Sequence, residues 1–278
     1  MAPRDRLVET RPTGAGRSRG LVSSRPSGSR VEARGFAPPE TLRDVVAALW
    51  CGSWDLRGQA PHVTERVSDP CVNIVFEVGD GAPGARLVGV WSQLWRRTLQ
   101  GTGRVWGAKL RAGAARAFLP EPASVYTDRI VPLAEVFDSA AIDIAADDAT
   151  VFAAFSAWLV ERRRVRAGDP VTARAIAVAE RITSDLSITS VERLAACSGL
   201  SSRALQRLFH EHVGVSPKHV IRTYRLQEAA LRIECGDVAT LAQLAADLGY
   251  TDQAHLAHDF KTMIGKAPSA FARSVHEP

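Results

Sequence analysis

The chain has 278 residues, of which 46% are hydrophobic and 23% are charged, and its formal net charge is +5. This length leaves room for about two domains, and the composition is typical of a globular protein. No apolar run approaches the roughly 20 residues of a membrane-spanning helix, and the N-terminus lacks the apolar block of a secretory signal. We therefore expect a cytoplasmic protein without membrane contact.

The positive charge lies mainly at the N-terminus. Residues 1–35 hold eight arginines and three acidic residues, whereas residues 36–189 hold 17 basic and 18 acidic residues, and residues 190–278 hold 10 and nine. The first 35 residues are also rich in Ser, Gly and Pro, which predicts a disordered basic tail. Overall basicity therefore does not indicate DNA binding here, and only basic residues gathered on one face would do so.

Residues 36–137 predict a β-rich domain, compatible with a small sandwich or barrel. A short amphipathic helix is expected at residues 39–50. Strand-like runs follow at residues 72–78, 86–91 and 104–111, and turn residues separate them.

Alternation in the last of these strands places Trp106, Ala108 and Leu110 on one face, with Lys109 and Arg111 on the other. The domain also holds five of the six tryptophans of the chain. Tryptophans of this density favour a role in the core over the lining of a ligand pocket. The five are Trp50, Trp54, Trp91, Trp95 and Trp106.

The sequence gives no indication of catalysis. Cys51, Cys71, Cys197 and Cys235 are widely spaced and lack a C-x-x-C pair, so they predict neither a disulfide framework nor a zinc site. We expect reduced thiols, with redox sensing through Cys51 and Cys71 as the alternative. His62 has no neighbouring His or carboxylate pattern, and no Ser/His/Asp order or Gly-rich phosphate loop stands out. We predict no catalytic residue, no cofactor and no metal.

Residues 138–184 predict a helical linker. An apolar helix at residues 150–160 ends in the charged run 161–166, whose arginines suit a helix C-terminus better than a phosphate site. Gly-Asp-Pro at 168–170 breaks the chain, and a second helix is expected at 171–183. The apolar faces of such helices are candidates for pairing in a homodimer.

A further helix is expected at residues 201–212. Ser201 stands where its hydroxyl would accept a hydrogen bond from the first turn, and Gly199 lies in the preceding turn. An Arg can bind guanine O6 and N7, and a Gln can bind adenine N6 and N7, so the polar face suits base recognition. For this helix alone, an ordinary surface helix is the alternative. The apolar face carries Leu205, Leu208 and Phe209, and the polar face carries Arg203, Gln206 and Arg207.

An internal repeat indicates two helix-turn-helix units. Residues 191–199 match residues 241–249 at an offset of 50. A helix that starts at Ser216 and Pro217 joins the two units and would fix their separation. If that separation is about 34 Å, both units can enter successive major grooves of one duplex. Downstream the offset is 51, and Leu205, Phe209, Gly214 and Pro217 pair with Leu256, Phe260, Gly265 and Pro268.

Residues 185–273 resemble the AraC/XylS family of bacterial transcription regulators. The resemblance implies a two-part DNA-binding domain attached to a domain that senses a ligand or dimerises. It makes a DNA operator, RNA polymerase, a small-molecule effector and a second copy of the chain candidate partners. Residues 36–137 look similar to N-terminal domains of some actinobacterial members. The motifs that carry the family resemblance are Leu194-Ala195, Gly199-Leu200-Ser201, Leu205 to Phe209, Gly214-x-Ser216-Pro217, Arg225-Leu226, Ala229, Leu244-Ala245, Gly249-Tyr250, Asp252-Gln253, Phe260-Lys261, Gly265 and Pro268.

The two expected recognition helices, 201–212 and 252–263, differ in their exposed residues. Ala254, Ala257 and His258 take the places of Arg203, Gln206 and Arg207. An Ala can contact a thymine methyl group but makes no bidentate hydrogen bond. The first helix should therefore supply most base discrimination, and the second should mainly hold position. The predicted DNA-binding residues are Ser202, Arg203, Gln206, Arg207, Gln253, Ala254, Ala257, His258 and Lys261.

Two residues depart from the usual pattern of the family. His258 stands where the family often has Arg, and the acidic Asp259 follows it. His255 and His258 are three residues apart, but two ligands are too few for a metal site, so we expect His258 to face a phosphate. An imidazole titrates near pH 6.5 in general, so acidification should strengthen DNA binding through this residue.

The sequence thus predicts an α+β protein. A β-rich N-terminal domain at 36–137 is followed by the helical linker at 138–184 and an all-α DNA-binding domain with two helix-turn-helix units at 185–278. The expected function is sequence-specific regulation of transcription, without enzymatic activity. The alternatives are a DNA-repair fusion with a cysteine methyl acceptor and a helix-turn-helix module that binds protein instead of DNA.

Overall fold

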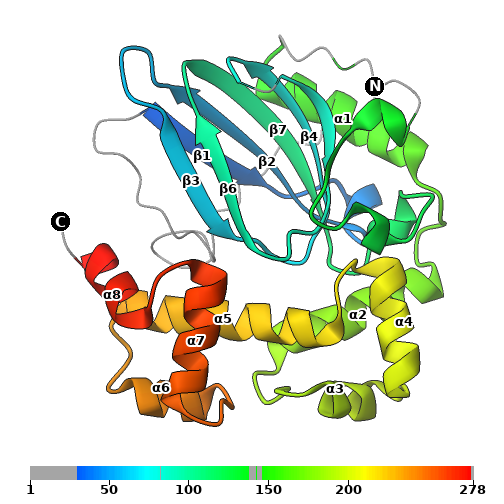
Figure 1. Cartoon of the computed structure of the whole chain (residues 1–278). Helices are drawn as coiled ribbons and strands as arrows, with labels where there is room; N and C mark the ends of the chain where they lie inside the picture. The colour runs from blue at the N-terminus through cyan, green and yellow to red at the C-terminus, as the bar shows by residue number, and fades with distance from the viewer. Residues whose placement is uncertain (1–29, 82, 138–141, 143–145, 277–278) are drawn as a thin grey trace.

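The computed structural model describes residues 30–81, 83–137, 142 and 146–276 of the chain. Strands occupy the N-terminal part and helices the C-terminal part, which confirms the predicted α+β class (Figure 1). Within the described residues, no helix is both long enough and apolar enough to span a bilayer. Most of the predicted basic tail, residues 1–29, lies outside the described residues.

Antiparallel strands build the N-terminal part. A six-stranded sheet has the order β1-β2-β7-β4-β5-β8, and β3 pairs separately with β6. The strands predicted near residues 72–78, 86–91 and 104–111 correspond to β4, β5 and β7. The bounds are β1 Arg30–Phe36, β2 Val46–Asp55, β3 His62–Val67, β4 Asn73–Gly79, β5 Gly84–Val88, β6 Leu94–Leu99, β7 Thr102–Leu110 and β8 Ile130–Pro132. Short 3-10 helices are η1 Glu40–Leu42, η2 Ala115–Ala117, η3 Ala123–Tyr126 and η4 Leu133–Glu135.

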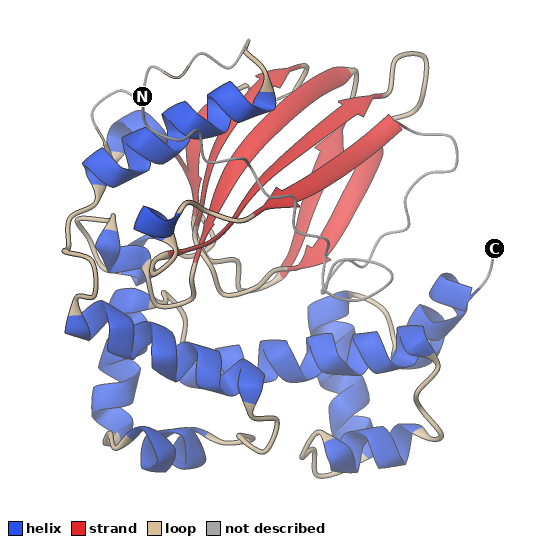
Figure 2. Cartoon of the chain, turned by 180° about the vertical axis from the view of Figure 1, so that it is seen from behind, coloured by secondary structure: helices blue, strands red, loops and turns tan. Residues whose placement is uncertain are grey.

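The two faces of the large sheet bury different sets of side chains. On β7, Trp106, Ala108 and Leu110 are 0% exposed and belong to the core that includes helix α1 (Asp148–Arg162), as the alternation predicted. Val105 instead packs with Trp54 and Leu99 in a second core on the opposite face. Figure 2 shows α1 lying across one face of the sheet. Strand β7 therefore contributes to two cores through its period of two.

The tryptophans do not line the pocket that lies beside α1 and η4. Trp54 and Trp106 are buried in the cores, which confirms the expected core role for these two, and the other three are half-buried. A pocket of about 450 Å³ is lined by Phe118, residues 134–137 and residues 161–164.

The helix predicted at residues 39–50 is wrong. The segment contains only the single turn η1 and then enters β2, which pairs with β1 and β7 on its two sides. Leu42, Val46 and Leu49 have helical spacing and are all buried, at no more than 1% exposure. A register shift between Val46 and Ala48 accompanies this burial in the strand. The buried residues with helical spacing therefore lie on a turn and a bulged strand instead of a helix.

The boundary of the predicted tail at residue 35 is also wrong. Residues 30–35 form most of β1, which pairs with β2 from Arg30 opposite Asp55 to Phe36 opposite Leu49. The composition of the segment suggested disorder, but an edge strand obtains much of its order from backbone hydrogen bonds to its neighbour.

The predicted linker is divided between the two parts of the molecule. Helix α1 contributes Phe152, Phe155 and Leu159 to the core beneath the sheet, so its apolar face is occupied within this chain. Helix α2 (Pro170–Ser184) contributes Val178 and Ile182 to a core of C-terminal helices. Both helices lie where the sequence predicted them, with a break between them.

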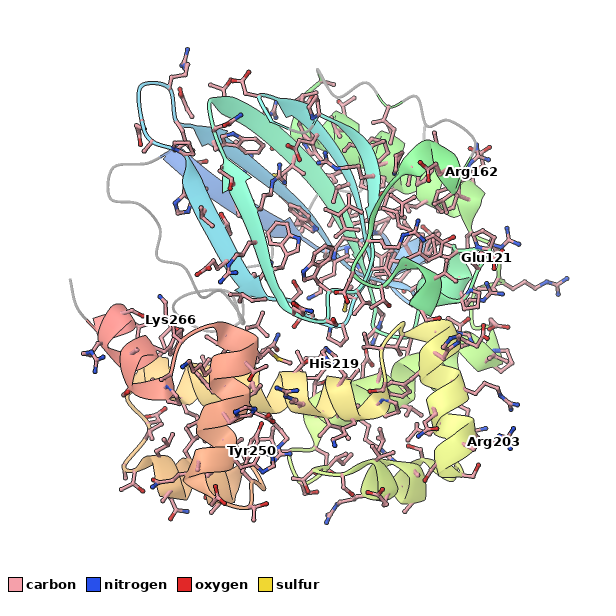
Figure 3. All side chains as sticks on the ribbon, in the orientation of Figure 1. Glu121, Arg162, Arg203, His219, Tyr250 and Lys266 are labelled. Carbon is pink, nitrogen blue, oxygen red and sulfur yellow. The ribbon has the colours of Figure 1, made fainter. Side chains whose placement is uncertain are left out.

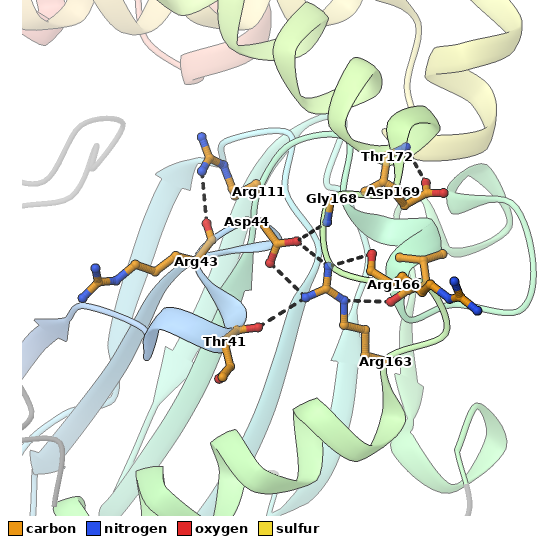
Figure 4. A network of polar contacts seen from close by, with 10 residues as sticks. Thr41, Arg43, Asp44, Arg111, Arg163, Arg166, Gly168, Asp169 and Thr172 are labelled. Atoms are coloured by element: carbon orange, nitrogen blue, oxygen red, sulfur yellow. Dashed lines mark hydrogen bonds and ion pairs between the residues drawn. The ribbon is translucent and has the colours of Figure 1, made fainter. Parts of the chain in front are cut away.

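An ion pair holds the break between α1 and α2. Arg163, which is 9% exposed, donates from Nη1 to Oδ1 of Asp44 at 2.9 Å, and Nη2 bonds the other carboxylate oxygen (Figure 4). The hydrogen bonds from Arg163 hold the pKa of Asp44 below its usual range. This arginine of the charged run is therefore structural, as expected.

Helices form the C-terminal part. The long helix α5 runs through its middle, α4 lies at one end of α5, and α7 crosses α5 nearer to its other end (Figure 1). The bounds are α3 Val191–Ser198, α4 Ser202–His212, α5 Pro217–Cys235, α6 Leu241–Asp247, α7 Gln253–Ile264 and α8 Pro268–His276.

Candidate nucleic-acid interface

Helices α3 and α4 form the first helix-turn-helix unit. The Oγ of Ser201 accepts a hydrogen bond from the backbone N–H of Ala204 at 3.2 Å, which confirms Ser201 as the N-cap of α4. Gly199 has φ = 61°, the left-handed conformation expected in the turn. The N–H of Leu200 bonds the carbonyl of Ala195 at 3.0 Å and closes the end of α3. Local chemistry thus fixes where α4 begins.

Helix α4 has one buried and one exposed face. Leu205 and Phe209 are 0% exposed and pack against α2 and α5. Ser202, Arg203, Gln206 and Arg207 are exposed, as predicted, and the end of α4 that carries Arg203 points away from the sheet (Figure 3). Within the part of the chain that the structure describes, the side chains of Arg203, Gln206 and Arg207 have no hydrogen-bond or ion-pair partner. Their donors are therefore available to a ligand outside the chain.

Helices α6 and α7 form the second unit on the same plan. Oδ1 of Asp252 accepts from the N–H of His255 at 2.8 Å and caps α7. Gly249 has φ = 69°, and the N–H of Tyr250 bonds the carbonyl of Ala245 at 2.8 Å. Leu256 and Phe260 are 0% exposed, so the buried pairs of the predicted repeat occupy equivalent places in both units.

The exposed face of α7 differs from that of α4. Gln253, Ala254, His258 and Lys261 are exposed and Ala257 is half-buried. The structure thus places every predicted DNA-binding residue at least partly on the surface, and it places the small alanines where α4 carries Arg203 and Gln206.

The acidic residue beside His258 belongs to a contact within the chain. Oδ2 of Asp259 lies 3.1 Å from Nε of Arg222 on α5, and the Asp259 side chain is 16% exposed. The ring of His255 lies edge-on to Tyr250 with centroids 5.1 Å apart. Among the described residues, no three His, Cys, Asp or Glu side chains are grouped as metal ligands would be.

The central helix α5 joins the two units. Its 19 residues span about 28 Å at about 1.5 Å per residue, somewhat less than the roughly 34 Å of one duplex turn. The N-terminal ends of α4 and α7, which adjoin α3 and α6, both point away from the sheet (Figure 1). The two exposed faces are therefore presented from one side of the molecule.

The N-terminal part contacts the C-terminal ends of the first unit and the middle of α5. Oγ of Ser124 lies 2.9 Å from Nε2 of His210, and Oγ1 of Thr127 donates to the carbonyl of Gly214 at 2.7 Å. Gln227 of α5, 1% exposed, donates to the carbonyl of Val67 at 3.1 Å.

A half-buried charged cluster extends the contact at Gln227. Its amide also donates to Oδ1 of Asp69 at 3.0 Å, and Asp69 forms an ion pair with Lys109 of β7. Burial acts to raise the pKa of Asp69, but the charge of Lys109 and its hydrogen bond prevail, and the pKa is lowered. The carboxylate therefore remains charged and links β7 to α5.

Burial also changes the titration of two histidines near this contact. It lowers the pKa of His212, with Arg116 adding to the effect, and it lowers the pKa of His219, with Arg222 adding to the effect. Neutral imidazoles are therefore favoured where the two parts of the molecule meet.

Sequence reasoning missed the contacts that place the second unit. They are the Arg222–Asp259 pair, the packing of Arg225 over the ring of Tyr250 with Cζ 4.0 Å from the ring centroid, and the approach of Gly249 to Thr189. No spacing rule connects these residues. In the sequence, Arg225 and Tyr250 stand out only as members of the family motifs, and Gly249 also as part of the internal repeat.

Comparisons with known proteins identify the class. Residues 194–274 match the family described as a helix-turn-helix domain, and residues 34–132 match a domain of unknown function (DUF6597). An uncharacterized HTH-type transcriptional regulator of Haemophilus influenzae is 33% identical over 85 residues, which are 31% of this chain and 28% of that protein. The XylDLEGF operon transcriptional activator of Pseudomonas putida is 33% identical over 82 residues, which are 29% of this chain and 26% of that protein.

A solved structure, that of a probable AraC family transcriptional regulator from Rhodopseudomonas palustris, is 29% identical and covers 35% of this chain and 93% of that chain, with a TM-score of 0.32. The chain spans little more than a quarter of the length of the two curated relatives, 28% and 26%. The shared region is the pair of helix-turn-helix units, which defines the class of the C-terminal domain. Over this region the chain is similar to regulators of the AraC/XylS family.

Proposed function

We propose that the chain is a sequence-specific DNA-binding regulator of transcription, in which α4 supplies most of the base discrimination and α7 mainly anchors. The observation that carries the proposal is the pair of capped recognition helices presented from one side of the molecule, with Arg203, Gln206 and Arg207 exposed and unpaired within the described residues. Arg and Gln are the side chains best suited to bidentate contacts with guanine and adenine.

The anchoring role of α7 rests on its short exposed side chains. Ala254 cannot donate a hydrogen bond, whereas Gln253, His258 and Lys261 can reach phosphates. Since Asp259 is paired with Arg222, its charge is partly neutralised within the chain. A phosphate near His258 therefore meets less repulsion than the sequence alone suggests.

Selection of binding sites from a random DNA pool by the purified full chain tests the proposal. The expected product is a two-part site with half-sites about 10 base pairs apart, bound with an affinity that falls linearly with the logarithm of salt concentration. A variant with Arg203, Gln206 and Arg207 all changed to Ala is the control and should enrich no defined sequence. Absence of salt-dependent affinity for any DNA would favour the protein-binding alternative and overturn the proposal.

We propose no enzymatic activity for the chain. Burial raises the pKa of the Cys71 thiol to about 12, and burial with the nearby Asp148 carboxylate raises that of Cys51 to about 11. A methyl acceptor needs a reactive thiolate near neutral pH, which these two cysteines do not supply. Cys197 and Cys235 are exposed, but they lie on the two-unit domain itself.

The N-terminal part is proposed to regulate DNA binding. Its contacts at His210, Gly214 and Gln227 reach both the end of α4 and the middle of α5. A small-molecule effector, a second copy of the chain and RNA polymerase remain the candidate partners. As a regulator of bacterial transcription, the protein would act in the cytoplasm.

A further inference from the structure

The turn of the second helix-turn-helix unit touches the first unit. A Cβ placed on Gly249 would lie 2.6 Å from Cγ2 and 3.1 Å from Cβ of Thr189. Thr189 directly precedes Ser190, the N-cap of α3. Real Cβ atoms essentially never approach another atom to 2.6 Å, so any other residue at this place requires Thr189 to shift.

The equivalent glycine of the first unit has no such neighbour. Gly199 has φ = +61° and Gly249 has φ = +69°, so each is favoured by its backbone conformation. A Cβ on Gly199, however, would have no atom within 4 Å. The two positions therefore share the backbone requirement, and only Gly249 adds a contact between the units.

Two arginines of α5 hold the second unit against the central helix. Cζ of Arg225 lies 4.0 Å from the ring centroid of Tyr250, and its Nη2 lies 3.5 Å from the Cβ position of Gly249. One helical turn earlier, Nε of Arg222 lies 3.1 Å from Oδ2 of Asp259 on α7. The turn and the recognition helix of the second unit are thus both fixed to α5.

A rigid central helix by itself fixes distance but not rotation. The second unit joins α5 through the short segment 236–240 and through a shared core, in which Leu226 of α5 packs with Leu256 and Phe260 of α7. These attachments hold the second unit to α5 alone. The contact at Gly249 adds an attachment to the entry of α3, and Arg225 holds the turn that carries Gly249.

We propose that Thr189, Gly249 and Arg225 form a junction that fixes the distance and rotation between α4 and α7, and thereby the spacing of half-sites that the protein accepts on DNA. The spacing part of this inference rests on the proposed function. Because the orientation is set before binding, little free energy is lost to ordering the protein when the half-sites have the right spacing. Binding to half-sites at another spacing requires the junction to deform, which weakens the affinity. The three residues are positioning residues and contact no base.

The test compares Gly249→Ala with Gly199→Ala, which place the same methyl group on the same type of backbone. Each variant is titrated with duplexes that carry the two half-sites at the selected spacing or changed by one to three base pairs, and with a single half-site. For Gly249→Ala we expect the preference for the selected spacing to fall roughly 2- to 30-fold, with single half-site affinity unchanged. For Gly199→Ala we expect the ratio between spacings to stay as in the parent protein.

Two further variants separate the contact from a general loss of stability. Thr189→Ser removes Cγ2, the atom nearest to the added methyl, and should partly restore the spacing preference of Gly249→Ala. Arg225→Met keeps an unbranched apolar side chain but removes the guanidinium, and should broaden the spacing preference by itself. An unchanged preference in Gly249→Ala, or equal broadening in Gly199→Ala, would overturn the proposal.

A measurement without DNA keeps the junction testable if the proposed function fails. Spin labels on α4 and α7 report their distance distribution, which should be narrow in the parent protein and in Gly199→Ala and broad in Gly249→Ala. A narrow distribution in Gly249→Ala contradicts the junction, whatever the DNA result. The labelled chain carries Ser202→Cys and Lys261→Cys together with Cys197→Ser and Cys235→Ser, which remove the exposed native thiols.

Discussion

The two helix-turn-helix units repeat each other where they are buried and differ where they are exposed. Leu205 and Phe209 in the first unit and Leu256 and Phe260 in the second are all 0% exposed. The turns of both units use a left-handed glycine, and both recognition helices have an N-cap side chain that accepts from the third residue along. A helix-turn-helix scaffold therefore constrains caps, turns and core, and leaves its outer face open to change.

The units also differ in the length of the turn. The N-cap Ser201 lies two positions after Gly199, whereas the N-cap Asp252 lies three positions after Gly249. The additional residue accounts for the change of offset from 50 to 51. In the second unit Tyr250 follows the glycine, is 7% exposed and packs against Arg225. The longer turn thus lies at the junction between the units.

The largest expected effect tests whether the two cores are equivalent. Phe209→Ala and Phe260→Ala should each lower the free energy of unfolding by about 3–5 kcal/mol, because each leaves a cavity in a closed core. Denaturant unfolding of the two variants measures the change. The cores would not be equivalent if the free energy of unfolding fell several times less in one variant than in the other. A core that collapses around the missing ring leaves a smaller cavity and loses less stability.

A smaller effect tests whether the exposed faces differ. Arg207→Ala should weaken binding to the selected operator by about 1–3 kcal/mol and relax its sequence preference. Ala257→Ser in the second unit is the matched control and should change affinity little, because it adds only one hydroxyl group to a half-buried β-carbon. Titration with matched and mismatched duplexes measures both, and equal losses of Arg207→Ala on the two duplexes would contradict a base-reading role.

The smallest expected effect concerns His258. If this side chain donates to a phosphate, His258→Ala should weaken DNA binding by at most about 1 kcal/mol, as for other exposed polar contacts. Titration of the parent protein and the variant with matched and mismatched duplexes measures the change, which should be the same on both duplexes because a phosphate contact carries no sequence information. Equal affinities of the two proteins would contradict the phosphate contact.

The C-terminal domain was more predictable than the N-terminal one for a physical reason. Caps such as Ser201 and turns such as Gly199 act over three or four residues, so their signals are read directly from neighbouring positions. At residues 39–50 the burial pattern was read correctly but assigned to a helix, because the strand β2 exists only through its pairing with β1 and β7. Strand pairing is a long-range property, and short apolar segments do not reveal it.

The same difference between local signals and long-range contacts holds for the residues of the candidate site. Periodicity alone placed Arg203, Gln206 and Arg207 opposite Leu205 and Phe209, and the structure has them exposed. Periodicity did not predict that Asp259 pairs with Arg222, which the structure shows.

The sequence by itself determined the two recognition helices, their caps, their turns and the residues on their outer faces, because these depend on interactions within a few residues. Only the tertiary structure decided how the helices are held. Thr189 meets Gly249 across 60 positions of the chain, and Gln227 bonds Val67 across 160. Such contacts depend on the closure of long loops and on packing between surfaces, and neither leaves a local pattern in the sequence.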